Sequence, residues 1–275
     1  MIMPLIAAHR GCGGGNVHCN TWVSFEAALM QGADIIEIDI SRSADGVFFV
    51  ALPGEEIHHL LSSRPISEMT AEEVKALRYI NMDHSPTSLG VSTLDDVLEQ
   101  LKGRCMVNLD KFQEHPAEIA ALVRRHGMQD QVIAKTPPSE EWFRIMEEAA
   151  PDLPYMAITR FTDDFSEHLM KRNVRYLGTE ALFRTEDEMV GQRSYVERMH
   201  KLGLKVWYNA IVCNNTSVNA FVHAAGHNDD LSISGRPDEG WGWLIDQGID
   251  VIQTDWPGML YQYMHNGYHK KATLL

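Results

Sequence analysis

Short apolar runs alternate with helical segments along this chain, and the alternation limits the folds that it can adopt. Strand and helix alternating this regularly predict a parallel sheet, and eight such units in 275 residues predict a (β/α)8 barrel. A doubly wound open sheet is the alternative, but no GxGxxG sequence opens a helix here. The runs lie at residues 4–8, 32–40, 105–110, 131–135, 155–158, 174–178, 204–208 and 250–254.

The second run carries two acidic side chains on one face. Glu37 and Asp39 lie two positions apart, so both point to the same side of a strand. A strand this rich in isoleucine is typical of a sheet that is covered on both faces. Because buried carboxylates need compensation, a divalent cation such as Mg²⁺ or Ca²⁺ is one interpretation. The other is a strand-end pair that faces solvent or binds Lys or Arg.

A short connection follows this strand. It contains the Asp45-Gly46 turn signal, and residues 47–51 form another apolar run, so we expect an antiparallel hairpin instead of a further barrel strand. We expect one barrel domain over residues 1–275, with a hairpin and insertion on its C-terminal face at about 47–90. The later segment 226–243 is too long for an ordinary connection and predicts either a lid or a loop pinned by tryptophans.

The overall charge excludes some partners. Asp and Glu outnumber Lys and Arg by 38 to 24, which gives a net charge of −14. Nucleic acid is therefore a poor partner, although a small phosphate compound can bind where local cations reverse the sign. No run approaches the ~20 apolar residues that cross a bilayer, so we expect no membrane partner. The absence of a basic leader, with four cysteines that lack metal-type spacing, predicts a cytoplasmic protein with free thiols.

Several local patterns occur in one order along the chain. In this order, and at these strand positions, they resemble the glycerophosphodiester phosphodiesterase family. Residues 108–111 are similar to the third metal-ligand strand of one branch of that family, and residues 226–257 also resemble this branch. The patterns are His9-Arg10-Gly11, Asn20-Thr21 with Ser24-Phe25, Gly32 to Asp39, Asp45-Gly46-Val47, and Thr254-Asp255-Trp256-Pro257 after Gly248-Ile249-Asp250.

The resemblance implies a TIM barrel that hydrolyses small phosphodiesters with one divalent cation, Mg²⁺ or Ca²⁺, with Mn²⁺ as a further option. Such a metal polarises the phosphoryl group, an imidazole moves the proton, and cationic side chains stabilise the transition state. The implied site residues are the metal ligands Glu37, Asp39 and Asp110, the acid or base His9, and the phosphate-binding cations Arg10 and Lys111 or Lys135.

Other residues are candidates for contacting the substrate. Glu180 and Asn209 lie near the ends of expected strands, and four tryptophans could stack on a sugar ring or simply pack against the barrel. These tryptophans are Trp207, Trp241, Trp243 and Trp256, of which we expect Trp207 and Trp243 at the substrate.

The chain departs from the family pattern after the hairpin. The family carries His-Asp there, and this histidine is its second acid–base group, whereas the matching positions here are Leu52 and Pro53. His58 and His59 follow shortly afterwards. Either could act as a substitute, or both could be surface histidines without a role.

Three interpretations follow. In the first, His9 is the sole catalytic histidine and a vicinal hydroxyl of the substrate attacks the phosphorus, which suits glycerophosphodiesters or sugar phosphodiesters of the agrocinopine type. In the second, His58 or His59 restores a two-histidine mechanism. In the third, the barrel binds a phosphate ligand without hydrolysing it. Because the expected metal ligands, His9 and Arg10 are all present, we favour an enzyme.

Overall fold

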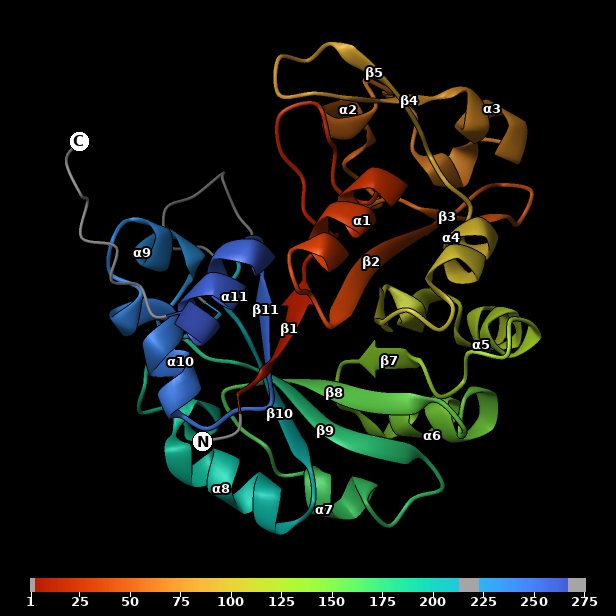
Figure 1. Ribbon diagram of the computed structural model, residues 1–275. Helices are drawn as coiled ribbons and strands as arrows, with labels where there is room; N and C mark the ends of the chain where they lie inside the picture. Colours follow the sequence, from red (N-terminus) through yellow and green to blue (C-terminus); the bar gives the residue numbers. More distant parts are fainter. Residues whose placement is uncertain (1–2, 213–222, 267–275) are drawn as a thin grey trace, which may run out of the picture.

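The computed structural model describes residues 3–212 and 223–266. Eight parallel strands form a closed barrel, because β1 pairs with β11 on one side and with β2 on the other (Figure 1). This confirms the (β/α)8 prediction and excludes the open sheet. In barrel order the strands are β1 (Leu5–Ala8), β2 (Ile35–Arg42), β6 (Met106–Asp110), β7 (Val132–Thr136), β8 (Pro154–Arg160), β9 (Arg175–Leu182), β10 (Lys205–Asn209) and β11 (Val251–Thr254).

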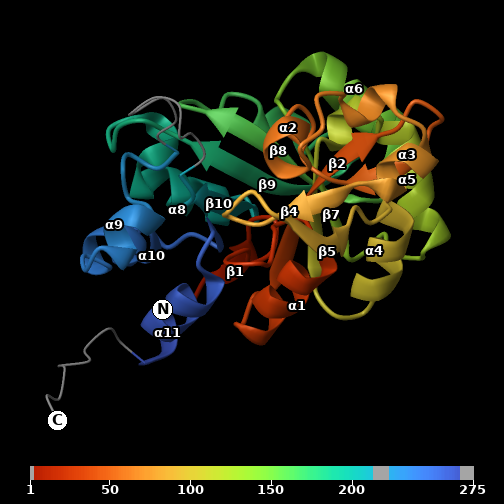
Figure 2. The same ribbon diagram turned by 90° about the horizontal axis from the view of Figure 1, so that it is seen from above.

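Helices cover the outside of the barrel, and α4 to α6 lie on the side opposite α9 to α11 (Figure 2). Local sequence explains where several of them begin. Thr21 caps α1 and Thr93 caps α4, each accepting a hydrogen bond from a backbone N–H of the first turn. The helices are α1 (Trp22–Met30), α4 (Leu94–Leu101), α5 (Pro116–Arg125), α6 (Glu140–Ala149), α7 (Ser166–Leu169), α8 (Arg193–Lys201), α9 (Asp229–Ile233), α10 (Trp243–Asp246) and α11 (Pro257–Asn266), with shorter turns η2 (Phe112–Glu114), η3 (Met189–Gly191) and η4 (Asp238–Gly242).

The inside of the barrel has an apolar layer below a polar one. Six residues from six strands form a buried apolar cluster there: Ala7, Ile35, Ile133, Met156, Trp207 and Val251. Two positions further along a strand, toward its C-terminal end, the side chain points to the same side. At those positions β2 carries Glu37, β10 carries Asn209 and β11 carries Gln253. The strand period therefore collects polar groups at the C-terminal face, where (β/α)8 enzymes keep their active sites.

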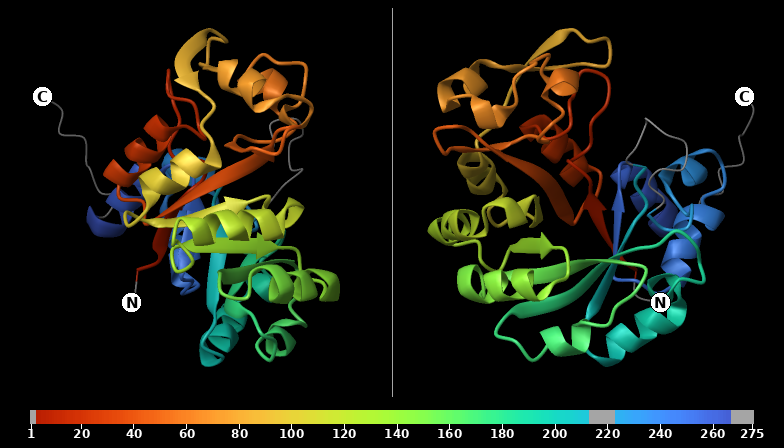
Figure 3. Two further views of the ribbon diagram at one scale, coloured as in Figure 1. Left: turned by 90° about the vertical axis from the view of Figure 1, so that its right-hand side faces the viewer. Right: turned by 180° about the vertical axis from the view of Figure 1, so that it is seen from behind.

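The segment after β2 projects from this end of the barrel, and its elements lie together in Figures 1 and 3. Its first strand, β3 (Phe48–Val50), pairs antiparallel with the end of β2. The segment has its own buried cluster, which includes Phe49, Met69 and Tyr79. Its remaining elements are α2 (Glu56–His59), η1 (Ile66–Glu68), α3 (Ala71–Ala76), β4 (Arg78–Ile80) and β5 (Pro86–Gly90).

Segment 226–243 is not an irregular loop but contains α9 and η4 and ends at the start of α10. Trp241 is buried in the cluster beneath α8, α10 and α11, and Trp243 packs against the same cluster. Of the two expectations for this segment, the tryptophan-pinned one is therefore correct. Cys12, Cys19 and Cys105 are free thiols, while Cys213 lies outside the described residues. Across those residues, every helix is too short or too polar to cross a bilayer.

Candidate active site

Three carboxylates converge at the C-terminal ends of β2 and β6. The two strands pair in register, with Asp39 opposite Asp110 and Glu37 opposite Asn108. Oxygens of Glu37, Asp39 and Asp110 all lie within 4.8 Å of one another. Glu37 is 3% exposed and Asp39 is fully buried. The structure thus brings together the three residues that the sequence proposed as ligands of one cation.

The chemistry of this cluster fits a hard divalent cation. Burial and the charge of Asp39 raise the pKa of Glu37 to about 8, as expected for carboxylates that lack full compensation. Asp39 Oδ1 and Asn108 Oδ1 are buried and have no hydrogen-bond partner within the described part of the chain. Carboxylate and amide oxygens are the ligands that Mg²⁺ and Ca²⁺ prefer. A cation here would satisfy these oxygens and offset the repulsion between Glu37 and Asp39.

Two basic residues partly offset the acidic charge. Both have left-handed backbones directly after barrel strands, with φ of 57° at Arg10 and 65° at Lys111. Arg10 Nε lies 2.9 Å from Asp39 Oδ2, and its backbone N–H donates to Glu37 at 2.8 Å. Lys111 Nζ donates to Asp110. Although burial alone would raise the pKa of Asp110, the ammonium of Lys111 holds it below its usual value.

His9 follows β1 and is held by a carboxylate from the far end of the chain. Its Nδ1 lies 2.8 Å from Asp255 Oδ1, so Nε2 is the ring nitrogen left to act on a ligand. Burial alone would lower the pKa of His9, but the hydrogen bond to Asp255 and the charge of Glu37 raise it above its usual value. The surroundings of His9 therefore favour its protonated form more than water does.

Asp255 is in turn positioned by the buried Asp229 of α9. The Asp229 carboxylate accepts hydrogen bonds from the Asp255 backbone N–H at 2.8 Å and from Thr254 Oγ1 and Trp241 Nε1 at 2.7 Å each. Burial raises the pKa of Asp229 to about 7. The 226–243 segment thus supports the turn that holds His9, although it contributes no stacking tryptophan.

A cavity of about 300 Å³ lies at the mouth of the barrel, and several of the groups described above line it: His9, Arg10, Glu37, Asp110 and Lys111. Glu180 and Asn209, expected as pocket residues, line it and bind each other, because Asn209 Nδ2 donates to Glu180 at 2.6 Å. Arg160, His223 and Gln253 also line the cavity, and sequence reasoning missed them. Arg160 and Gln253 could have been found from their positions near strand ends, whereas no local signal marks His223.

Three of the expected substrate contacts lie elsewhere, which corrects our prediction. Lys135 is buried, donates to Glu180 at 2.7 Å, and its ammonium lies 3.2 Å from the centroid of the Trp207 ring. Trp207 is fully buried in the apolar layer below the cavity. Trp243 stacks on His227 at 3.8 Å. None of the three lines the cavity at the carboxylates.

A second cavity of about 310 Å³ adjoins the first, and the two share His9 and Arg10 as lining residues. Trp256, which is 43% exposed, lines this second cavity. Of the four candidate tryptophans, Trp256 is therefore the one that lies beside the expected substrate site.

Neither substitute histidine lines either of these cavities. His58 lines a separate hollow of about 390 Å³ beside the glycine-rich loop. The ring of His59 contacts that of His18 edge to face at 4.6 Å, and burial lowers the pKa of His59 to about 4. His58 and His59 are thus set apart from the carboxylates.

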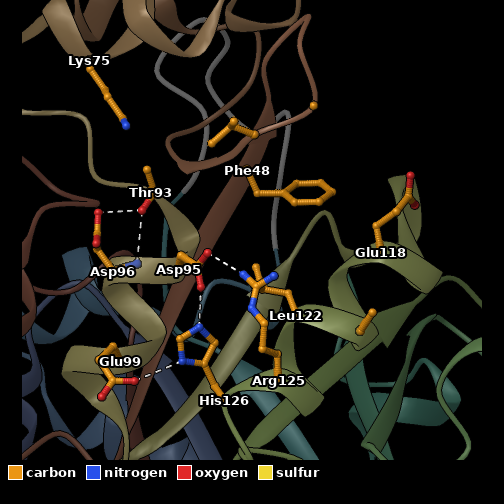
Figure 4. Close-up of a pocket in the computed structure, with 13 residues that line it drawn as sticks. Phe48, Lys75, Thr93, Asp95, Asp96, Glu99, Glu118, Leu122, Arg125 and His126 are labelled. Carbon is orange, nitrogen blue, oxygen red and sulfur yellow. Dashed lines mark hydrogen bonds and ion pairs between the residues drawn. The ribbon is translucent and has the colours of Figure 1, made fainter.

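A larger hollow of about 820 Å³ lies outside the barrel, where β3, α4 and α5 meet (Figure 4). Several of its charged groups already bind one another. Asp95 accepts hydrogen bonds from Arg125 and His126, and Glu99 contacts the same imidazole (Figure 4). Size alone would favour this hollow as a binding site, but the concentration of uncompensated carboxylates and the imidazole favour the barrel mouth.

Fold and geometry together define a (β/α)8 barrel with a cluster of three carboxylates at its C-terminal face. Comparison with known proteins agrees with this class. A family model described as a domain of unknown function matches residues 155–264. An uncharacterised protein of Bacillus subtilis is 29% identical over 49% of this chain and 58% of its own length. A glycerophosphodiester phosphodiesterase of Bacillus altitudinis is 32% identical over 39% of this chain and 45% of its own length.

The chain therefore spans about half the length of the curated relatives that it matches. Solved structures match over nearly the whole chain. A glycerophosphoryl diester phosphodiesterase of Parabacteroides distasonis has a TM-score of 0.77 at 18% identity, covering 95% of this chain and 86% of its own. A glycerophosphodiester phosphodiesterase of Agrobacterium tumefaciens has a TM-score of 0.67 at 24% identity, covering 94% and 99%.

A phosphodiesterase of Oleispira antarctica, solved with the product sn-glycerol-3-phosphate, also matches, with a TM-score of 0.67 at 18% identity over 95% of this chain and 97% of its own. At these identities the structural likeness shows the fold. The chain thus has the (β/α)8 fold of these solved phosphodiesterases.

Proposed function

We propose that this protein is a metal-dependent phosphodiesterase that hydrolyses a small phosphodiester to a phosphomonoester and an alcohol. The substrate would be a glycerophosphodiester or a sugar phosphodiester of the agrocinopine type. The observation that carries the proposal is the convergence of Glu37, Asp39 and Asp110, two of which, Glu37 and Asp110, line one cavity with His9. The Oleispira antarctica neighbour, which binds sn-glycerol-3-phosphate, supports a small phosphate ligand.

In this proposal Glu37, Asp39 and Asp110 hold one Mg²⁺ or Ca²⁺. When bound, such a cation polarises a phosphoryl oxygen and lowers the pKa of a bound water or hydroxyl. Arg10 and Lys111 now pair with the same carboxylates, at Asp39 and Asp110 respectively. A cation would take over part of that pairing and leave their charges for the phosphate oxygens, where they would stabilise the transition state.

His9 moves the proton. The hydrogen bond from Nδ1 to Asp255 fixes the ring and supports its protonated form, so Nε2 can donate a proton to the oxygen of the departing alcohol. A positioned imidazole of this kind contributes about 10²- to 10⁴-fold to the rate. We therefore expect His9→Ala to abolish measurable turnover of diesters whose alcohol leaves poorly, and His58→Ala and His59→Ala to leave most of it.

The test is release of phosphomonoester from a panel of glycerophosphodiesters, sugar phosphodiesters and a chromogenic diester, with and without EDTA. We expect activity that EDTA removes and that Mg²⁺ or Ca²⁺ restores. A protein that stays inactive on the whole panel when supplied with metal contradicts the proposal.

A second candidate is a barrel that binds a phosphate ligand without hydrolysing it. The observation in its favour is that Leu52 and Pro53 occupy the positions of the second histidine in the family that the sequence resembles. Tight binding of inorganic phosphate or glycerol phosphate by calorimetry, without turnover of any diester, would support this candidate. A cytoplasmic location, a single domain over residues 1–275 and the absence of nucleic-acid partners stay predictions.

A further inference from the structure

We propose that His223 is a second catalytic residue, the general base that works opposite His9. The inference rests on the proposed phosphodiesterase function and deepens it. It starts from the cavity itself, because His9 and His223 are the two histidines that line it among the described residues. They reach it from unrelated parts of the chain, His9 from the end of β1 and His223 from the segment after β10.

The backbone of His223 is held firmly at the rim of the barrel. Phe183, directly after β9, donates its N–H to the His223 carbonyl at 3.0 Å and accepts from the Ala225 N–H at 3.1 Å. Phe183 and Ala224 form a parallel bridge, and both side chains are buried in one apolar cluster. Residues 223–225 therefore continue the strand pairing just beyond β9. This pairing fixes the position of the backbone that carries the His223 imidazole.

The surroundings of His223 differ from those of His9. Burial lowers the pKa of His223, Glu180 opposes this shift, and the charges of Arg160 and His9 add to it. These groups face His223 from β9, β8 and the end of β1. A neutral imidazole can accept a proton at neutral pH, whereas His9 is held by Asp255 in a form that can donate one.

The proposed step is balanced with these two groups. His223 takes a proton from the attacking water, or from a vicinal hydroxyl of the substrate, as the new P–O bond forms. The bond from phosphorus to the departing alcohol breaks, its electron pair stays on the alcohol oxygen, and His9 donates a proton to that oxygen. His223 ends protonated and His9 ends neutral, and proton exchange with solvent restores both.

The experiment compares His223→Ala and His223→Gln with the intact chain on two substrates. One is a glycerophosphodiester, whose alcohol leaves poorly, and the other is bis(p-nitrophenyl) phosphate, whose leaving group needs no proton. Loss of a base should lower kcat by about 10²-fold or more on both substrates with little change in KM. Loss of the acid in His9→Ala should cost much less on the nitrophenyl substrate.

His227→Ala is the matched control, because His227 lies on the same segment but stacks on Trp243 and binds Glu186 at 3.0 Å, outside the cavity. It should retain the kcat of the intact protein. Added imidazole should restore part of the activity of His223→Ala, and the acidic limb of the kcat–pH profile should disappear in both His223 variants. Circular dichroism and thermal melting establish that each variant is folded.

Two results would overturn the inference while leaving the proposed function intact. One is a folded His223→Ala variant with kcat within about threefold of the active parent. The other is a raised KM at unchanged kcat, which would make His223 a phosphate ligand. If the parent hydrolyses no diester with metal present, the proposed function fails first, and the role of His223 fails with it.

Discussion

Metal binding to this protein should depend steeply on pH, because a cation and a proton compete for Glu37. Burial and the neighbouring charge of Asp39 raise the pKa of Glu37 to about 8. At pH 6 the metal-free carboxyl is therefore protonated, and binding must displace that proton. Apparent affinity should rise by about tenfold per pH unit up to pH 8, equivalent to roughly 1.4 kcal/mol per unit, and should level off above it.

Isothermal titration calorimetry with Mg²⁺ or Ca²⁺ at pH 6, 7 and 8 measures this directly. Titrations in two buffers of different ionisation enthalpy should report release of about one proton at pH 6, falling as the pH approaches 8. Glu37→Gln should bind weakly and lose the pH dependence. Asp110→Asn is the matched control, since Lys111 keeps the pKa of Asp110 low and this carboxyl is ionised throughout the range.

The hydrogen bond to Asp255 raises the pKa of the neighbouring His9, so the pH dependence of metal affinity is also measured in His9→Asn. A dissociation constant that stays flat between pH 6 and 8 in both backgrounds, with no proton released, would refute this reasoning. The raised pKa of Glu37 also determines how the stability of the metal-free protein changes with pH. The unfolded Glu37 ionises from pH 4.5 upward while the folded one keeps its proton, so the metal-free protein should lose stability relative to Glu37→Gln as pH rises toward 8.

Three further substitutions test residues that hold the candidate site in place. Asp255→Asn removes the charge that raises the pKa of His9, so the alkaline limb of the kcat–pH profile should move to lower pH and kcat at pH 8 should fall by about 10- to 100-fold; an unmoved limb would contradict this. Asp229→Ala removes the acceptor of three buried hydrogen bonds and should cost about 3 kcal/mol or more in urea unfolding; a loss below about 1 kcal/mol would show that the network is dispensable. Gly11→Ala places a Cβ 2.6 Å from Ser24 Oγ at a φ of +80°, so it should lower both the melting temperature and kcat; a variant with parental values of both would disprove it.

Strand geometry explains why the three carboxylates of the proposed metal site lie together. Glu37 and Asp39 are two apart on one strand, so they share a face, and Asp110 ends the next strand of the barrel. Neighbouring parallel strands end at the same rim. The strand period predicted that Glu37 and Asp39 share a face, whereas Asp110 was named as a third ligand through the family resemblance. The observed register of β2 against β6 places Asp110 opposite Asp39.

The sequence did not show how deep inside the barrel an inward-facing side chain lies. Lys135 and Trp207 both point inward, but they form a cation–π pair below the cavity. Whether a residue lies in the upper or lower layer depends on the stagger between strands, which varies around a barrel. The register of β10 against β9 puts Trp207 beside Glu180, and no local pattern in the sequence encodes that register.

The proposed proton-transfer groups are positioned differently from the proposed metal ligands. Ladder hydrogen bonds between β2 and β6 fix the carboxylates, so moving one of them would break the barrel. His223 and Asp255, by contrast, lie on segments beyond strand ends, and such segments can approach a cavity from several directions without disturbing the sheet. A histidine missing at Leu52 therefore does not by itself remove acid–base chemistry from this barrel, because an imidazole on another rim segment can face the same phosphorus. That is why the kcat of the His223 variants, and not the sequence after β3, decides between hydrolysis by two histidines and hydrolysis by one.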